Sequence, residues 1–307
     1  MAGYLEELTL RLAVGASQLP AANRERHAHW IRAKQHASGG FAGREGDADP
    51  YYTAFALRSL FLLGELDEGT ATASSSFLRD RMQKRDSVVD LISLIFAAAI
   101  IELATGQVVL ADEGPWRQNV AALLNSLQTD GGGFAKTPEG RAGSTYQTFL
   151  SVLCLELIDV PVKDHLSVQQ FLDGQRHPDG GYLEIRVAKR AGVNPTAAAI
   201  GTLKTLQSLD ASEQQDTIAF LSQMQSDEGG LSANTRIPFA DLLSTFTGLL
   251  TLVDLDGLDE LDIPAIQRYA SSMEQAGGGF HGIFMDQTAD VEYTFYGLAT
   301  QALLSTL

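Results

Sequence analysis

The chain has 307 residues, of which 45% are hydrophobic, enough for one large core or two ordinary ones. A formal net charge of −16 at pH 7 and a pI of about 4.7 oppose nucleic-acid binding through a general basic surface. The single cysteine, Cys154, excludes an intramolecular disulfide and suits a reducing compartment.

The N-terminal region predicts two amphipathic helices, over residues 3–14 and 21–34, which we assign to an N-terminal segment 1–30 that leads into the rest of the chain. Glu6 and Glu7 stand where a signal peptide would be basic, so a cytoplasmic protein is expected. The longest apolar run, Leu91 to Ile101, is shorter than the roughly 20 residues that span a bilayer. It predicts a fully buried helix and no transmembrane segment.

A glycine-rich unit organises residues 31–307. In its first copy, Gln35 leads into Gly39-Gly40-Phe41, and after a polar loop Asp49 and Pro50 begin a helix. Matching glutamines are separated by 48, 45, 47, 50 and 50 residues, and the second copy lacks the glycines. These glutamines are Gln35, Gln83, Gln128, Gln175, Gln225 and Gln275.

The spacing predicts a repeat protein in which each unit of about 45–50 residues supplies two helices. Neither helix can bury its apolar face alone, so neighbouring pairs must stack. Further along the chain, residues 65–75 predict a turn before a helix from Ser76 to Gln83, and Asp290 to Leu307 predict the final helix. Six helical hairpins can form an open solenoid or a closed ring, and no linker divides the chain, so a single domain over residues 1–307 is expected.

The Gln-x-x-x-Gly-Gly-Phe units, followed by helices that carry an aromatic residue and a threonine, resemble the repeats of protein prenyltransferase β subunits and class II terpene cyclases. The resemblance covers roughly residues 30–307. It implies an all-α fold, an α/α toroid (an α6-α6 barrel) with a central apolar cavity for a polyprenyl chain. It also implies a possible helical partner subunit, as prenyltransferase β subunits have.

The zinc site of protein prenyltransferases implies an Asp-x-Cys sequence and a histidine in the last repeat. This chain has Asp241 at the first place, but Leu243 replaces the cysteine and Tyr293 replaces the histidine. Leucine offers zinc no ligand, so no metal site is predicted and zinc-dependent alkylation is not expected. Mg²⁺ would accompany a diphosphate substrate. The six histidines are expected on the surface.

Class II cyclases protonate a double bond with a buried aspartic acid, and the nearest sequence here runs from Asp47 and Asp49 to Thr53-Ala54. The last repeat offers Asp290 and Glu292. If the ring closes, Asp49 could face one of these, and one carboxyl group of such a pair would be held protonated as an acid. The alternative is that Asp49, Asp90, Asp241 and Asp290 cap helices.

A prenyl diphosphate needs basic side chains for its anionic head. The loops after the glycine turns carry Arg44, Lys136 and Arg141, and a denser cluster formed by Arg186, Lys189 and Arg190 with Arg236 from the next unit. We assign the dense cluster to substrate binding; ordinary solvated loop charge is the alternative. Aromatic residues at the starts of the second helices suit a polyprenyl chain or a carbocation, or else pack between helices. Those assigned to the lining are Tyr52, Tyr146, Tyr293 and Phe295.

Three functions therefore remain open. The first is an isoprenoid-processing enzyme, either a transferase or a cyclase without the usual catalytic sequence. The second is a non-catalytic toroid that binds an isoprenoid or a partner. The third is a carbohydrate-active toroid, which the acids and aromatics favour and the presence of only two tryptophans opposes.

Overall fold

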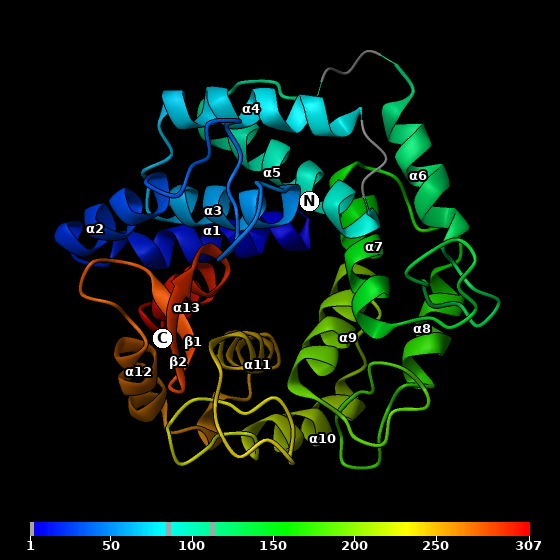
Figure 1. Ribbon diagram of the computed structural model, residues 1–307. Helices are drawn as coiled ribbons and strands as arrows, with labels where there is room; N and C mark the ends of the chain where they lie inside the picture. The colour runs from blue at the N-terminus through cyan, green and yellow to red at the C-terminus, as the bar shows by residue number, and fades with distance from the viewer. Residues whose placement is uncertain (1–2, 84–86, 111–113) are drawn as a thin grey trace. The chain divides into compact units, whose positions relative to one another are not determined.

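The computed structural model describes residues 3–83, 87–110 and 114–307, and the protein is mostly helical (Figure 1). Its elements alternate between a first helix and a second helix, which in every repeat but the second are separated by a glycine turn. The first helices are α2 (Ala21–Arg32), α4 (Glu68–Met82), α6 (Trp116–Ser126), α8 (His165–Asp173), α10 (Ala211–Ser222) and α12 (Ile263–Ser272). The second helices are α3 (Pro50–Leu62), α5 (Val88–Thr105), α7 (Thr145–Leu157), α9 (Val193–Thr205), α11 (Leu242–Asp254) and α13 (Val291–Leu304). The remaining elements are α1 (Tyr4–Ser17), the 3-10 helix η1 (Leu258–Glu260), β1 (Phe280–Ile283) and β2 (Asp286–Asp290).

The chain divides into two compact units. The terminal unit comprises Leu8–Gly114 and Gln267–Leu307, and the middle unit comprises Pro115–Ile266 with the residues up to Glu7. Each has its own buried apolar residues. The single-domain organisation stays a prediction.

In each complete repeat, one glycine that approaches a neighbouring helix adopts a positive φ, between +89° and +99°, which L side chains rarely adopt. A Cβ atom there would lie 2.0 to 2.8 Å from a backbone carbonyl oxygen of the first helix of another repeat. The close approach therefore requires glycine. The contacts are Gly39 with Ala73 of α4, Gly132 with Ser167 of α8, Gly180 with Asp216 of α10, Gly229 with Ala265 of α12, and Gly278 with Arg26 of α2.

A buried threonine in the second helix joins each glycine turn to that helix. Its hydroxyl accepts the backbone N–H of the residue after the glycines, at 2.9 to 3.1 Å, and donates to the carbonyl of the N-cap residue, at 2.6 to 2.7 Å. One side chain thus satisfies a buried donor and anchors the first turn of the helix. The pairs are Phe41 with Thr53, Phe134 with Thr148, Tyr182 with Thr196, Leu231 with Thr245, and Phe280 with Thr294.

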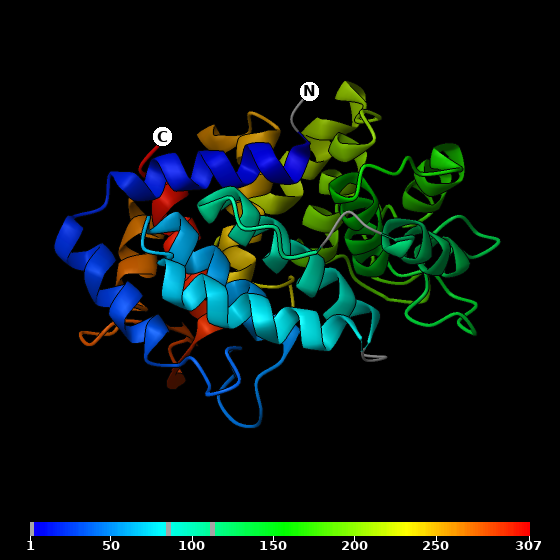
Figure 2. The same cartoon turned by 90° about the horizontal axis from the view of Figure 1, so that it is seen from above.

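In the terminal unit, the last repeat packs on the first. Helix α13 lies against α3, which also packs on α5 (Figure 2). Gly278 contacts α2 as the other glycines contact their neighbouring first helices. The contact between the last helix and the first repeat, which a closed ring would require, is therefore present within this unit.

The terminal unit also contains a hairpin that the all-α expectation did not include. Strands β1 and β2 pair antiparallel, with Phe280 opposite Asp290 and a register shift between His281 and Ile283. The hairpin ends at the N-cap of α13, so it positions the start of that helix.

In the middle unit, α9 packs against both α7 and α11. Hydrogen bonds also link the start of a second helix to the loop that follows the next glycine turn: Thr145 N–H donates to Glu184 O at 2.9 Å, and Val193 N–H donates to Ala233 O at 2.9 Å. The start of α1 belongs to the same unit, where Tyr4 donates its hydroxyl to Asp254 at 2.9 Å.

Two expectations about individual helices need correction. Helix α4 begins at Glu68 rather than Ser76, because the Asp67 side chain accepts the Thr70 N–H and caps the helix eight residues earlier than predicted. The apolar run belongs to α5, which is only partly buried: 44% of its 18-residue window lies inside the protein. By length and composition alone, α5 is the one helix among the described residues that could cross a membrane, a test that core helices also pass.

We expect Gly132→Ala to lower the free energy of unfolding by about 3 kcal/mol, because it combines a φ of +89° with a 2.0 Å approach to the Ser167 carbonyl. Urea unfolding measures the difference. Gly131→Ala is the control: its Cβ would have only the Thr129 hydroxyl, at 3.7 Å, within 4 Å, so a change within about 0.5 kcal/mol is expected. Equal losses would contradict the role of Gly132.

Two substitutions of the linking threonine distinguish the contribution of its hydroxyl group from that of its side-chain shape. Thr148→Val should lower the free energy of unfolding by about 1–3 kcal/mol, since the buried N–H of Phe134 loses its acceptor. Thr148→Ser keeps the hydroxyl and should lose clearly less in the same urea titration. If serine were as destabilising as valine, packing of the methyl group would explain the position instead.

Candidate functional site

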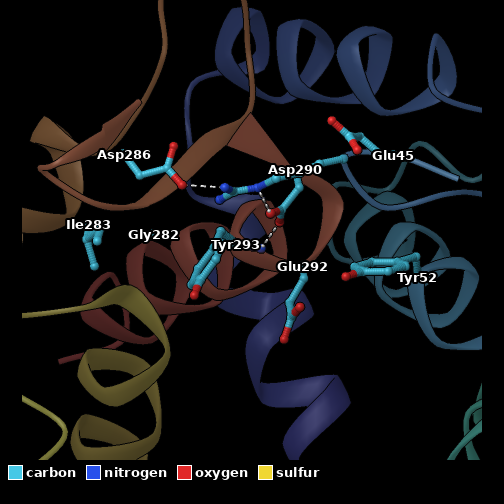
Figure 3. A pocket seen from close by; sticks show the side chains of 9 residues that line it. Glu45, Tyr52, Gly282, Ile283, Asp286, Asp290, Glu292 and Tyr293 are labelled. Carbon is cyan, nitrogen blue, oxygen red and sulfur yellow. Dashed lines mark hydrogen bonds and ion pairs between the residues drawn. The ribbon is translucent and has the colours of Figure 1, made fainter. Parts of the chain in front are cut away.

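A pocket of about 390 Å³ lies in the terminal unit, beside the starts of α3 and α13 and the β1–β2 hairpin (Figure 3). Its walls come from the first and last repeats, whose contact brings together residues about 240 positions apart. It is lined by Arg44, Glu45, Tyr52, Gly282, Ile283, Asp286, Asp290, Glu292 and Tyr293.

Arg44 holds the hairpin side of this pocket together. Its guanidinium pairs with Asp286, and its Nε donates to Asp290 Oδ2 at 2.9 Å. The hydrogen bond from Arg44 lowers the pKa of Asp286 to about 2. The second oxygen of Asp290 accepts the Tyr293 N–H at 2.8 Å, so this carboxylate caps α13 and orients Arg44 at the same time.

Glu292, in the first turn of α13, has a different environment. Its Oε1 accepts a hydrogen bond from the hydroxyl of Tyr51 at 2.8 Å. Burial raises the pKa of Glu292; the Tyr51 hydrogen bond opposes this shift, the nearby Asp290 carboxylate adds to it, and the net direction is upward. Its carboxyl group is therefore closer to the protonated form near neutral pH than an exposed glutamate would be.

Tyrosines surround this acid. Tyr51 and Tyr52 pack edge to face with their ring centroids 5.3 Å apart, and Tyr293 packs edge to face against Tyr296. Tyr52 directs its hydroxyl toward the side of the pocket that holds Glu292 (Figure 3). Burial raises the pKa of Tyr52, as do the neighbouring carboxylates, so this phenol stays neutral.

The pocket is electronegative, because Arg44 is the one cationic side chain among four carboxyl groups in its lining. Two of those carboxylates already engage its guanidinium. Such a lining opposes a diphosphate and suits a developing positive charge, which tyrosine ring faces also stabilise. The pocket can therefore supply a proton beside electron-rich rings.

The other predicted acids act as helix caps. Asp49 accepts the Tyr52 N–H at 2.8 Å and lies outside the pocket lining, where its charged neighbours are Asp90 and Arg81. Asp241, in the middle unit, accepts both the N–H and the hydroxyl of Ser244. Burial raises the pKa of Asp49 and of Asp241.

The start of α5 differs from the expected cap. Ser87, and not Asp90, is the N-cap residue, and Asp90 completes a capping box as the third residue of the helix.

The four predicted lining aromatics have separate environments. Tyr52 and Tyr293 line the pocket. Tyr146 lies in the middle unit with 40% of its surface exposed. Phe295 is only 1% exposed and belongs to the core, where the guanidinium of Arg58 lies 3.9 Å from its ring centroid.

The predicted phosphate-binding cluster lies in the middle unit. Arg186, Lys189 and Arg190 are exposed on one loop and Arg236 on the next, with Arg190 Nη1 3.4 Å from the Thr235 hydroxyl. None of these cations lines the pocket of the terminal unit.

The donor set does not fit the zinc site of protein prenyltransferases. Leu243 and Tyr293 stand where a thiolate and an imidazole would be needed, and the Asp241 carboxylate is engaged by Ser244. Among the described residues, no three His, Cys, Asp or Glu side chains are grouped to hold a metal ion.

The surface expectation is wrong for two histidines. His27 and His281 are 1% and 3% exposed. His27 Nδ1 accepts the Gly279 N–H at 3.0 Å, so Nε2 carries the proton and donates to Glu274, and burial lowers the pKa of His27 to about 4. This neutral histidine helps to join the last repeat to the first.

Sequence reasoning missed Tyr51, Glu45 and Asp286 as members of the site. It noted Arg44 only as one of the basic loop residues and did not assign it to the site, whereas the structure pairs this side chain with two aspartates. The acidic hairpin carrying Asp286 was visible in the sequence, but its proximity to Arg44 depends on contact between the two ends of the chain.

Comparisons with known proteins identify the fold. The sequence matches the family model for the prenyltransferase alpha-alpha toroid domain over residues 8–182, 94–236 and 196–307. Comparison with curated protein sequences gave no match. Among solved structures, Candida albicans protein geranylgeranyltransferase-I complexed with GGPP is similar, with a TM-score of 0.65, 16% identity and coverage of 90% of each chain. A variant of the type II terpene cyclase MstE from Scytonema, in complex with geranylgeranyl dihydroxybenzoate, has a TM-score of 0.65, 12% identity and coverage of 98% of each chain.

The raised pKa of Glu292 predicts a pH-dependent stability. Folding raises the pKa of this carboxyl group, so ionising it lowers the free energy of unfolding. The loss of stability is absent below the unfolded-state pKa and develops as the pH rises through the folded-state pKa. Glu292→Gln should therefore raise the melting temperature at pH 8 and change it less at pH 4. Glu45→Gln, at an exposed position of the same pocket, should show no such pH dependence. A pH-independent effect of Glu292→Gln would contradict the assignment.

Proposed function

This chain belongs to the prenyltransferase alpha-alpha toroid family, and from that premise we propose that it is an isoprenoid-processing enzyme of the terpene-cyclase type. The observation that carries the proposal is Glu292: a carboxyl group with a raised pKa, held by the Tyr51 hydroxyl in a pocket lined by tyrosines.

The proposed reaction begins with proton transfer from Glu292 to a carbon–carbon double bond of a polyprenyl substrate. The π electrons form the new C–H bond and leave a tertiary carbocation, which another double bond of the same chain attacks to close a ring. Loss of a proton to water ends the sequence, so the product is an isomer of the substrate. Tyr52 and Tyr293 present ring faces that stabilise the cation, and the surrounding carboxylates lower its energy further.

The positioning of the acid follows from the fold. One oxygen of Asp290 accepts the Tyr293 N–H, and the other accepts a hydrogen bond from Arg44. These two contacts fix the first turn of α13 and therefore the position of Glu292. Tyr51, from α3, holds the acid from the opposite helix. A cyclase role is favoured over zinc-dependent alkyl transfer because the chain lacks two of the three protein ligands for that metal and because the pocket is electronegative.

The substrate class is a polyprenyl chain, with geranylgeranyl compounds as the first to test. Both structural relatives named above were solved with a geranylgeranyl ligand, GGPP in one and geranylgeranyl dihydroxybenzoate in the other. The electronegative pocket favours a neutral end of such a molecule near Glu292, with any anionic head elsewhere.

We expect incubation with geranylgeranyl substrates in D₂O to give a cyclic isomer that carries one deuterium from the initiating proton transfer, detected by mass spectrometry. Glu292→Gln should reduce turnover by about 10²–10⁴-fold, the usual contribution of a general acid. Glu45→Gln, at an exposed position of the same lining, should retain most of the activity.

Other outcomes would support the remaining functions. A polyprenyl ligand that raises the melting temperature without turnover would indicate a non-catalytic binding toroid. Stabilisation by oligosaccharides alone would favour a carbohydrate-active protein. Full activity of Glu292→Gln, or a product without deuterium, would refute Glu292 as the acid.

A further inference from the structure

The middle unit presents a basic edge that the proposed reaction does not use. It consists of the loops that follow three successive glycine turns, over residues 135–144, 183–192 and 232–241. The backbone hydrogen bonds from Thr145 to Glu184 and from Val193 to Ala233, described above, connect the residue that follows each of the first two loops to the next loop. Arg190 adds a side-chain contact to Thr235. The three loops therefore form one continuous edge of this unit.

Six exposed cations gather on this edge, in a chain whose formal net charge is −16. No ion pair involves any of them within the described residues. The same loops hold three acids: Glu139 is exposed, Glu184 is half-buried and accepts a hydrogen bond from Ser144, and Asp241 caps α11. Cations outnumber acids on the edge, so it is basic in an acidic protein. The cations are Lys136, Arg141, Arg186, Lys189, Arg190 and Arg236.

Apolar side chains project from the centre of the basic edge. The Ala188 N–H donates to Ile185 O at 2.8 Å, which makes a turn with Arg186 and Val187 at its corners. Val187 is 82% exposed and Ile185 is 38% exposed. An isolated exposed valine is ordinary, but here it stands at the tip of a turn with basic residues on both sides.

We propose that the basic edge docks the protein on an anionic phospholipid surface, with Val187 and Ile185 entering the interface and the cations contacting lipid phosphates. Phosphate could also come from a soluble diphosphate, the assignment that the sequence suggested. A free anion needs no apolar turn tip, so the exposure of Val187 and Ile185 favours the lipid surface.

Electrostatic screening allows this docking despite the negative net charge. The Debye length is about 8 Å at physiological ionic strength, so charges on distant faces are screened while residues at the interface act directly on the lipid phosphates. Each basic residue near an anionic surface strengthens binding several-fold, and burial of aliphatic groups adds a contribution that salt does not screen. The proposal does not depend on the proposed reaction.

Flotation of the 307-residue chain with lipid vesicles tests the proposed docking of the basic edge. We expect binding to vesicles of phosphatidylglycerol at least about tenfold tighter than to phosphatidylcholine, and weaker at high salt. Arg186→Glu combined with Lys189→Glu should weaken binding about thirtyfold or more. Val187→Ser should weaken it about tenfold, since it removes apolar surface without changing the charge.

The matched control combines Lys163→Glu with Arg268→Glu, two exposed cations outside the basic edge. It changes the net charge by the same amount and should leave vesicle binding nearly unchanged. Circular dichroism and melting temperatures of all variants show whether the fold is retained.

Three results would overturn the proposal: equal binding to both vesicle types, equal losses in the two charge-reversal pairs, or a Val187→Ser variant that binds vesicles as the wild type does. Millimolar pyrophosphate provides a further arm. If it abolished vesicle binding at constant ionic strength while Val187→Ser had no effect, the basic edge would be a soluble-anion site instead.

Discussion

The structure depends on a threonine hydroxyl that performs two tasks in each complete repeat. It accepts the backbone N–H of the residue after the glycines and donates to the carbonyl of the residue that caps its own helix. A serine could supply the same hydroxyl, but the β-branched side chain restricts χ1 and keeps the oxygen in place. Because one buried group fixes both the turn and the helix start, the position of each second helix follows from its glycine turn.

The same contacts that stack sequential repeats also join the last repeat to the first in the terminal unit. Gly278 approaches the backbone of α2 as Gly132 approaches α8, and the neutral ring of His27 accepts the Gly279 N–H. Burial, together with the nearby Arg26 charge, lowers the pKa of His27 to about 4, so the ring stays neutral and keeps this acceptor near neutral pH. The pocket exists because this junction places the loop that carries Arg44 against the β1–β2 hairpin.

Much of the fold was predictable from the sequence, because the glutamine, glycine and threonine positions that recur every 45–50 residues are those that make the repeated contacts. The start of α4 was not, because the cap at Asp67 lies in a polar stretch without apolar periodicity. Asp290 and Glu292 were predictable as acids, but a sequence does not show that Arg44 neutralises one while Tyr51 holds the other. The burial of Phe295 likewise depends on packing between α3 and α13. The sequence alone does not distinguish it from Tyr293, because both are aromatic residues in the first turns of the same helix.

The position of a carboxylate in the first turn of a helix decides whether it stabilises the fold or is available for chemistry. At the N-cap, the oxygens of Asp49, Asp241 and Asp290 accept backbone N–H groups, so replacing any of them would damage the helix as well as any reaction. Two residues later, Glu292 has no backbone duty and its environment can shift its pKa without loss of the cap. The first turn of a second helix therefore contains two positions with separate roles. The N-cap residue maintains the repeat structure, and the residue two positions later can change without loss of the cap. Residues in the first turn that do not cap the helix, such as Leu243 and Glu292, can therefore change while the contacts between the repeats stay the same.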